Sequence, residues 1–274
     1  MNPTQNMPAT LSLLSRIARQ AGAVIMAEYA TDFRVQGKAD ASPVTEADER
    51  AEALILAGLA AGWPQIPVVA EEAVAAGHIP AVGSQFWLVD PLDGTREFVS
   101  RNREFTVNIA LIDQGQPVLG VVFGPALGLQ GRLWAGAAGH GATLEDEAGR
   151  RPIACRAAPA GGLDVLASRS HGDVAALDAF LARYLAGRRV ASLHNAGSSL
   201  KLCLLAAGQA DLYPRLGRTM EWDIAAGHAV LAAAGGSVCR VDDGTPLRYG
   251  KPGFENPHFV AAGRPGPDLA GSAA

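Results

Sequence analysis

Two aspartates three residues apart follow an apolar run in the first half of the chain. The segment 87–93 reads WLVDPLD, so Asp90 and Asp93 stand where a strand would end. Mg²⁺ prefers oxygen ligands such as carboxylates, carbonyls and water. Pro91 restricts the turn between the aspartates, which could aim the Leu92 carbonyl at the same ion. The segment is therefore a candidate site for a hard cation.

Gly94 and Thr95 extend this pattern toward phosphate chemistry. Gly94 has no side chain where a ligand must approach, and Thr95 offers a hydroxyl. If a helical turn starts here, its free N–H groups form a seat for a phosphate oxygen. The same residues also describe an ordinary strand-to-helix turn in which Asp93 caps a helix. Spacing alone leaves both interpretations open.

Glu71 is the acid best placed to join the two aspartates. It follows the short apolar segment 67–70, which begins with proline and is typical of a strand. In an adjacent strand its carboxylate would lie beside Asp90, and such like charges repel unless a cation binds. Burying one of these charges without a partner is costly. These acids therefore favour a metal-binding cluster over a simple turn.

Other acids have a second explanation. Thr45 and Asp48 have the spacing of a capping box, and Asp223 lies in the first turn of an apolar helix, where the helix dipole favours it. In isolation both aspartates are explained as caps. The stretch 45–97 holds nine acids and two bases. Part of this excess, at Glu46, Glu49 and Glu52, is explained as well by a solvated helix face as by a metal site.

Composition limits the classes of partner. The 274 residues are 49% hydrophobic and carry a net charge of −4, which gives no general attraction for nucleic acid polymers. The three scattered cysteines fit buried free thiols in a reducing compartment, which favours the cytoplasm. Residues 1–10 lack the pattern of an export signal, and no run of 18 apolar residues occurs, so we expect no transmembrane segment.

The pattern of elements predicts two lobes of mixed α and β structure. A helix is expected over 11–29 and another after Thr45. The first lobe should contain an antiparallel sheet from β-rich runs at 86–90, 105–112, 117–123 and 132–135. Strands then alternate with helices, at 165–168, 174–185, 190–193, 198–207, 210–214 and 222–234.

The boundary between the lobes is expected near Ala157, because 156–162 is rich in alanine, proline and glycine. The first lobe, 1–156, would then carry most of the metal ligands. The second, 157–264, would carry Asp223 and the residues that select the substrate. The last residues, 265–274, have almost no bulky apolar groups and are expected to form a disordered tail.

The motifs Asp90 to Thr95 and Trp222 to Gly227 resemble the two signature motifs of the inositol monophosphatase superfamily. Within it, the segments 87–113, 197–201 and 220–236 are most similar to the CysQ-type 3'(2'),5'-bisphosphate nucleotidases, and the similarity covers nearly the whole chain. The resemblance implies a layered αβαβα sandwich of the α+β or α/β class, with the active site between two lobes. It also implies a Mg²⁺-dependent phosphatase of small phosphorylated metabolites.

The resemblance further implies roles for individual residues. Two or three Mg²⁺ ions would be held by Glu71, Asp90, the Leu92 carbonyl, Asp93 and Asp223. Glu71 and Thr95 would orient a metal-activated water for in-line attack on phosphorus, and Asp48 would hold the Thr95 hydroxyl, so no covalent phosphoenzyme is required. The residues expected to contact the substrate are Glu71, Leu92, Asp93, Gly94, Thr95, Gly197, Ser198, Lys201 and Asp223.

The segment 197–201, GSSLK, could offer N–H groups, hydroxyls and a positive charge to a second phosphate or a ribose. Arg215, Arg218 and the segment 168–171 are further candidates for the cleft. The alternative is a helix cap at Ser198, with solvated positions for the cations and an ordinary loop at 168–171. His228 and Cys203 are interpreted as packing residues.

Two positions depart from the nucleotidase pattern. Arg103 stands where glycine is usual, which puts the local turn geometry in question, and Ile224 stands where threonine is usual. Neither is a proposed ligand.

The leading hypothesis is hydrolysis of the 3'-phosphate of adenosine 3',5'-bisphosphate to AMP and phosphate, as in sulfur metabolism. An inositol or sugar monophosphatase and a non-catalytic sensor of phosphorylated metabolites are the alternatives. The motifs of P-loop enzymes, α/β-hydrolases and zinc proteases are missing. The resemblance also predicts inhibition by lithium and calcium. A monomer or homodimer is expected, and peripheral contact with the inner membrane stays open.

Overall fold

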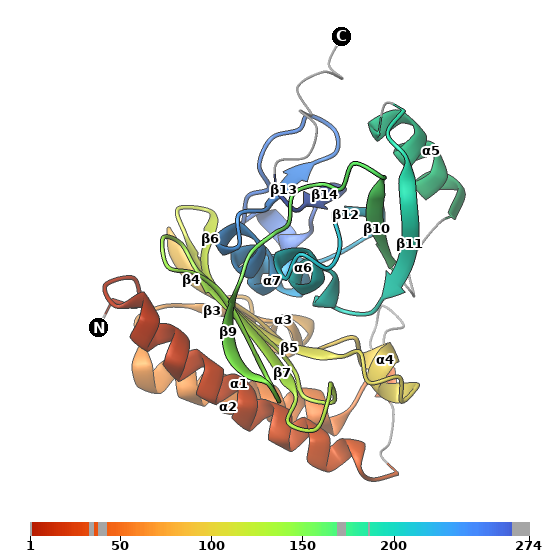
Figure 1. Cartoon of the computed structure of the whole chain (residues 1–274). Coiled ribbons are helices and arrows are strands. Elements are labelled where there is room, and N and C mark those ends of the chain that lie inside the picture. The colour runs from red at the N-terminus through yellow and green to blue at the C-terminus, as the bar shows by residue number, and fades with distance from the viewer. Residues whose placement is uncertain (1, 33–35, 38–42, 169–173, 186, 265–274) are drawn as a thin grey trace.

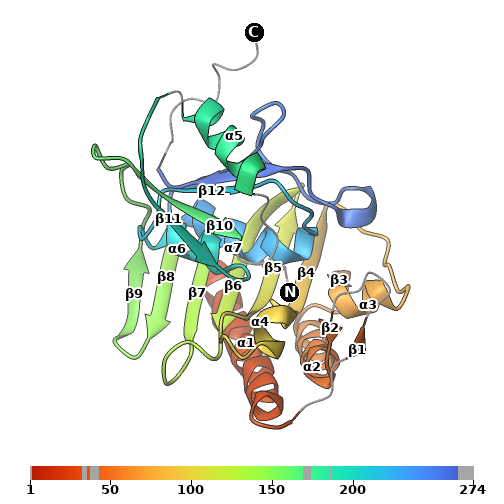
Figure 2. The same cartoon turned by 90° about the vertical axis from the view of Figure 1, so that its right-hand side faces the viewer.

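The computed structural model describes residues 2–32, 36–37, 43–168, 174–185 and 187–264. In this part of the chain the elements stack in five layers: helices, a sheet, helices, a second sheet and a helix (Figure 1). Figure 2 shows the larger sheet and the smaller sheet on opposite sides of the central helices. The expected αβαβα sandwich is therefore confirmed.

The first outer layer consists of α1 (Met7–Tyr29) and α2 (Glu46–Gly62). Asn6 caps α1 by accepting a hydrogen bond from the Ala9 N–H. The buried residues of α1 recur every three or four positions, so one face of the helix packs on the sheet. The capping box predicted at the start of α2 is present.

The larger sheet has seven strands in the order β3-β4-β5-β6-β7-β8-β9. Its first pair is parallel and the remaining pairs are antiparallel, as the turn signals between the runs predicted. The last two strands, β8 and β9, were not predicted, because β9 is largely exposed and β8 has only two buried apolar residues, Ala142 and Leu144. The strands are β3 (Val68–Ala70), β4 (Gln85–Asp93), β5 (Thr106–Asp113), β6 (Gln116–Gly124), β7 (Arg132–Ala137), β8 (Gly141–Asp146) and β9 (Gly149–Ile153).

The central layer consists of α6 (Leu200–Ala206) and α7 (Glu221–Ala233). Most residues of α7 are buried, because it lies between the two sheets. Gly120 of β6 permits the closest approach: a Cβ there would lie 2.5 Å from the Ala226 carbonyl oxygen. The glycine therefore fixes how deeply α7 sits on the sheet.

The smaller sheet has the order β11-β10-β12-β14-β13 and carries α5 (Val174–Tyr184) on its outer face (Figure 2). Its strands are β10 (Leu163–Ser168), β11 (Val190–Ala196), β12 (Leu212–Arg215), β13 (Ser237–Arg240) and β14 (Phe259–Ala262). The short elements are β1 (Gln36–Gly37), β2 (Pro43–Val44), α3 (Glu71–Ala75), α4 (Thr95–Val99) and a 3-10 turn at Pro252–Phe254.

One buried cluster joins the two sheets, since it contains Phe86 and Trp134 from the larger sheet and Tyr213 and Phe259 from the smaller one. The lobe boundary near residue 157 stays a prediction, and the expected tail lies outside the described residues. Cys155 and Cys203 are buried, Cys239 is half-buried, and all three are free thiols, as predicted. Among the described residues, every helix is too short or too polar to span a membrane.

Candidate active site

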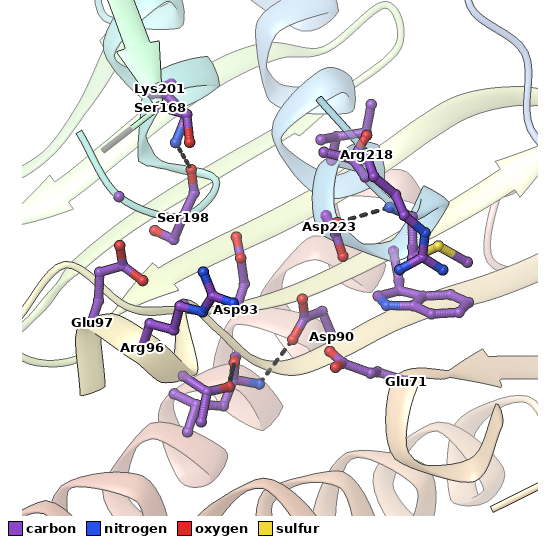
Figure 3. A pocket seen from close by; sticks show the side chains of 18 of the residues that line it. Glu71, Asp90, Asp93, Arg96, Glu97, Ser168, Ser198, Lys201, Arg218 and Asp223 are labelled. Atoms are coloured by element: carbon purple, nitrogen blue, oxygen red, sulfur yellow. Dashed lines mark hydrogen bonds between the residues drawn. The ribbon is translucent and has the colours of Figure 1, made fainter. Parts of the chain in front are cut away.

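A cavity of about 660 Å³ opens between the end of β4, the start of α7 and the segment before α6 (Figure 3). The structure brings together here all the residues predicted for metal and substrate binding, and of the predicted catalytic residues all but Asp48. Asp48 lies behind this surface and does not line the cavity. The predicted residues in the lining are Glu71, Asp90, Leu92, Asp93, Gly94, Thr95, Gly197, Ser198, Lys201 and Asp223.

The turn at the end of β4 positions the two aspartates. The pairing with β5 shifts register between Asp90 and Asp93, so the chain bulges where Pro91 was expected to constrain it. The Leu92 N–H donates to Asp90 Oδ1 at 3.0 Å. Gly94 follows with a φ of 90°, a left-handed conformation that glycine adopts without strain, and α4 begins at the next residue. The predicted helical turn is therefore present.

Glu71 enters from the neighbouring strand. β3 runs parallel to β4, with Ala70 opposite Val89, so Glu71 and Asp90 follow paired positions, as predicted. Glu71 is the first residue of α3 rather than the last residue of the strand. In Figure 3 its carboxylate points toward that of Asp90.

Thr95 is held by a residue of α2. Its hydroxyl lies 3.3 Å from Asp48 Oδ1 and 3.2 Å from the Leu92 carbonyl oxygen, and both are acceptors. The other Asp48 oxygen accepts from the Thr45 N–H at 2.9 Å and the Thr45 hydroxyl at 2.8 Å. Asp48 is 1% exposed and therefore both caps α2 and holds the Thr95 hydroxyl. The two interpretations of Asp48 are thus compatible.

Asp93 and Asp223 are linked through Asn108, which the sequence did not reveal, and through Ser199, which lies in the segment 197–201 but was not expected to contact the aspartates. The Ser199 N–H and the Asn108 amide donate to Asp93 Oδ2 at 2.5 and 3.3 Å. The Ser199 hydroxyl donates to the Asp223 carbonyl oxygen, and the Asp223 carboxylate accepts from the Met220 N–H at 2.8 Å. This network joins the larger sheet to both central helices.

Burial disfavours the ionised forms of Asp93 and Asp223. It raises the pKa of Asp93 to about 6, although the charge of Lys201 and the hydrogen bonds from Ser199 and Asn108 offset part of the increase. The pKa of Asp223 lies well above its usual range, because of burial first and then the charges of Asp93 and Glu71. A bound cation would stabilise the ionised form of both groups.

The donors fit Mg²⁺ in kind, because carboxylates and a carbonyl are hard oxygen ligands. The four carboxylates face one space in Figure 3. In the described part of the chain, however, no three acidic, histidine or cysteine side chains are gathered tightly enough to hold an ion.

The positively charged side chains near the cavity differ in their burial and in their hydrogen-bond partners. Lys201 is 4% exposed and donates to the Ala196 and Ser198 carbonyl oxygens at 3.0 and 2.6 Å, so the interpretation as a solvated residue is wrong. Burial lowers its pKa to about 8. Arg215 is also buried, and it donates to the Gly217 and Arg218 carbonyl oxygens, so it is no surface charge.

Arg218 is exposed and lies 3.2 Å from a Glu255 carboxylate oxygen. Arg96 also lines the cavity, and the described residues offer its guanidinium no ion-pair or hydrogen-bond partner. Its position beside Thr95 is the signal in the sequence that could have identified it. Ser168 lines the cavity, while residues 169–171 lie outside the described part of the chain.

The structure also places the two expected packing residues and the two positions that depart from the nucleotidase pattern. His228 and Cys203 are buried, as expected for packing residues. Arg103 has a φ of 72°, so the conformation that favours glycine is retained although arginine occupies the position. Ile224 is buried and also lines the cavity.

The chain therefore combines a five-layer fold with a carboxylate-lined cavity beside its central helices. The chain belongs to the inositol monophosphatase family, whose sequence model matches residues 8–265. Members of this family are metal-dependent phosphatases, so the chain is an enzyme of that kind.

Individual relatives agree. The chain is 44% identical over 257 residues to the 3'(2'),5'-bisphosphate nucleotidase CysQ of Escherichia coli O157:H7, which covers 91% of this chain and 98% of the relative. The crystal structure of CysQ from Bacteroides thetaiotaomicron is similar with a TM-score of 0.76 and 35% identity, covering 94% and 98% of the two chains. The structure of an inositol monophosphatase from Anabaena is similar with a TM-score of 0.71 and 26% identity, and the match covers 95% of this chain and 92% of that one.

Proposed function

We propose that this chain is a 3'(2'),5'-bisphosphate nucleotidase that removes the 3'-phosphate of adenosine 3',5'-bisphosphate and releases AMP and phosphate. The observation that carries the proposal is the 44% identity to a CysQ nucleotidase over nearly its whole length. The cavity supports it, because carboxylates and cations lie in one space large enough for a nucleotide.

Mg²⁺ ions, two or three in number, would be held by Glu71, Asp90, the Leu92 carbonyl, Asp93 and Asp223. Bound there, they would lower the pKa of water and stabilise the charge on the phosphate. Burial of Asp93 and Asp223 supports this assignment, because both carboxylates need a cation to remain ionised at low cost.

Glu71 and Thr95 would orient the water that attacks phosphorus. The Thr95 hydroxyl has one proton, which faces two acceptors, Asp48 Oδ1 and the Leu92 carbonyl oxygen. Its lone pairs remain to accept a hydrogen bond from the water. Asp48 thereby fixes the direction of the Thr95 hydroxyl, and displacement in line with the leaving oxygen needs no covalent intermediate.

The second phosphate would bind at the other end of the cavity. Gly197, Ser198 and Lys201 lie there, and Gly94 lies close to Ser198, since a Cβ at Gly94 would be 3.3 Å from the Ser198 Cβ. Lys201 would act mainly through its charge, because its ammonium already donates to two carbonyl oxygens. Arg96 would supply a guanidinium that no described residue engages.

The test is phosphate release from adenosine 3',5'-bisphosphate and from inositol 1-phosphate, with and without Mg²⁺. We expect the nucleotide to be preferred by a wide margin and the reaction to need Mg²⁺. The reverse ranking would identify an inositol or sugar monophosphatase. Binding of the nucleotide without phosphate release over hours would identify a sensor. Millimolar lithium is expected to inhibit, and unchanged activity would argue against the nucleotidase assignment.

A further inference from the structure

Glu52 is a buried acid that accepts hydrogen bonds from the backbone of another helix. It lies on α2 and is 5% exposed, so the interpretation that places it on a solvated helix face is wrong. Its Oε2 accepts from the Glu72 N–H and its Oε1 from the Ala73 N–H, each at 2.8 Å. Both carboxylate oxygens therefore bind the start of α3, which is a different element of the chain.

The start of α3 needs such a partner. The helix has only five residues, and its N-cap, Ala70, has no side chain that can accept a hydrogen bond. A helix this short has little stability of its own. Glu52 satisfies two of the free N–H groups and places a negative charge at the positive end of the helix dipole. Glu71 is the first residue of this helix, so its backbone lies directly before the two anchored groups.

Asp48, one helical turn earlier on α2, holds another residue of the site. It lies four residues before Glu52, so both side chains project from the same face of α2. Asp48 holds the Thr95 hydroxyl and Glu52 holds the segment of Glu71. One face of one helix therefore supports both residues to which we assign orientation of the water.

We propose that Glu52 is a positioning residue for Glu71, and that α2 sets the distance between Glu71 and Thr95 through Glu52 and Asp48. The inference rests on the proposed function, since it concerns the placement of a water-orienting and metal-binding side chain. A purely structural cap would stabilise the fold and leave the reaction unchanged, so the two roles are separable.

The test compares Glu52→Gln with Asp211→Asn. Glutamine keeps the volume of Glu52 but has one acceptor oxygen, so its NH₂ group faces one of the two N–H donors. Asp211 is a control of similar burial, because it is 7% exposed, accepts from the Asp164 N–H and from the Arg156 guanidinium at 2.8 Å, and does not line the cavity. Five quantities are measured on the full chain: kcat and KM for adenosine 3',5'-bisphosphate at saturating Mg²⁺, Mn²⁺ affinity by calorimetry, amide hydrogen exchange in α3, and stability in urea.

We expect Glu52→Gln to lower kcat on the order of tenfold to a hundredfold, as a small displacement of an orienting group does. KM should change less than kcat, Mn²⁺ binding should weaken, and the amides of α3 should exchange faster. Asp211→Asn should lose a similar amount of stability in urea and keep kcat and Mn²⁺ affinity within twofold of wild type. If Glu52→Gln does not fold, Glu52→Asp, which keeps the charge and shortens its reach, replaces it with the same expectations.

The inference is overturned if the Glu52 variant keeps kcat and Mn²⁺ affinity within twofold, or if both variants lose activity in proportion to stability. Failure of the proposed function gives a different result. The wild type would then release no phosphate from the nucleotide, while Mn²⁺ affinity and exchange in α3 would still report whether Glu52 positions Glu71.

Discussion

His228 gives a quantitative test of how α7 is packed. It lies on this helix five residues after Asp223, and its Nδ1 is 2.9 Å from the Tyr249 hydroxyl. Burial alone lowers the pKa of His228 from 6.5 to about 3. The ring therefore stays neutral in the folded protein over the range in which an exposed histidine gains a proton.

The direction in which pH changes the unfolding free energy follows from the pKa values of His228 in the unfolded and folded chain. Below pH 6.5 the unfolded chain binds a proton that the folded chain does not bind, so acid favours unfolding. The stability that neutral His228 contributes is complete above pH 6.5 and is lost as the pH falls toward 3. Each pH unit in this window costs about 1.4 kcal/mol of unfolding free energy, which gives about 2 kcal/mol at pH 5.

The perturbation is His228→Gln, which cannot titrate and can still form a hydrogen bond with Tyr249. Urea unfolding, followed by tryptophan fluorescence at pH 7.5 and pH 5.0, gives the unfolding free energy of each protein. The wild type should lose about 2 kcal/mol more than the variant between the two pH values. Equal losses would show that His228 is protonated in the folded state and would refute the packing described for α7.

Three further changes have defined outcomes. Arg103→Gly removes a left-handed φ from arginine and should raise the unfolding free energy by about 0.5 to 1 kcal/mol in thermal or urea melts; a lower value would mean that the arginine side chain stabilises the turn. Gly120→Ala places a Cβ 2.5 Å from the Ala226 carbonyl oxygen and should cost about 1 to 3 kcal/mol, whereas Gly83→Ala, with open space around it, should be neutral; equal stabilities would contradict this packing. Thr95→Val keeps the shape of threonine without its hydroxyl and should lower kcat about a hundredfold or more, while Thr95→Ser should retain most activity; an active valine variant would remove Thr95 from the reaction.

Local patterns predicted much of the fold. The apolar period of α1, the capping box of α2 and the turn after Asp90 all depend on residues close together in sequence, and each is present. The weak points were the last two strands of the larger sheet. The edge strand β9 is largely exposed, so no alternation of buried and exposed positions marks it, and in β8 the alternation is limited to two buried residues, Ala142 and Leu144.

Apart from Asp48, the predicted site residues line one cavity, but the contacts that hold them in place were not visible in the sequence. Asn108 and Ser199 contact Asp93 across 15 and 106 residues of chain, and although Ser199 lies in the segment 197–201, neither contact follows from a local motif. Glu52 looked like a solvated acid, because helical spacing does not show that α3 covers it. Supporting contacts of this kind form only when distant elements pack, whereas the signature motifs are local.

The most direct test of the central claim is anomalous X-ray scattering from crystals of the protein grown with Mn²⁺, a stand-in for Mg²⁺ that scatters strongly. We expect anomalous peaks at coordination distance from the carboxylates of Glu71, Asp90, Asp93 and Asp223. Manganese bound elsewhere, with Asp223 remote from every peak, would contradict this claim.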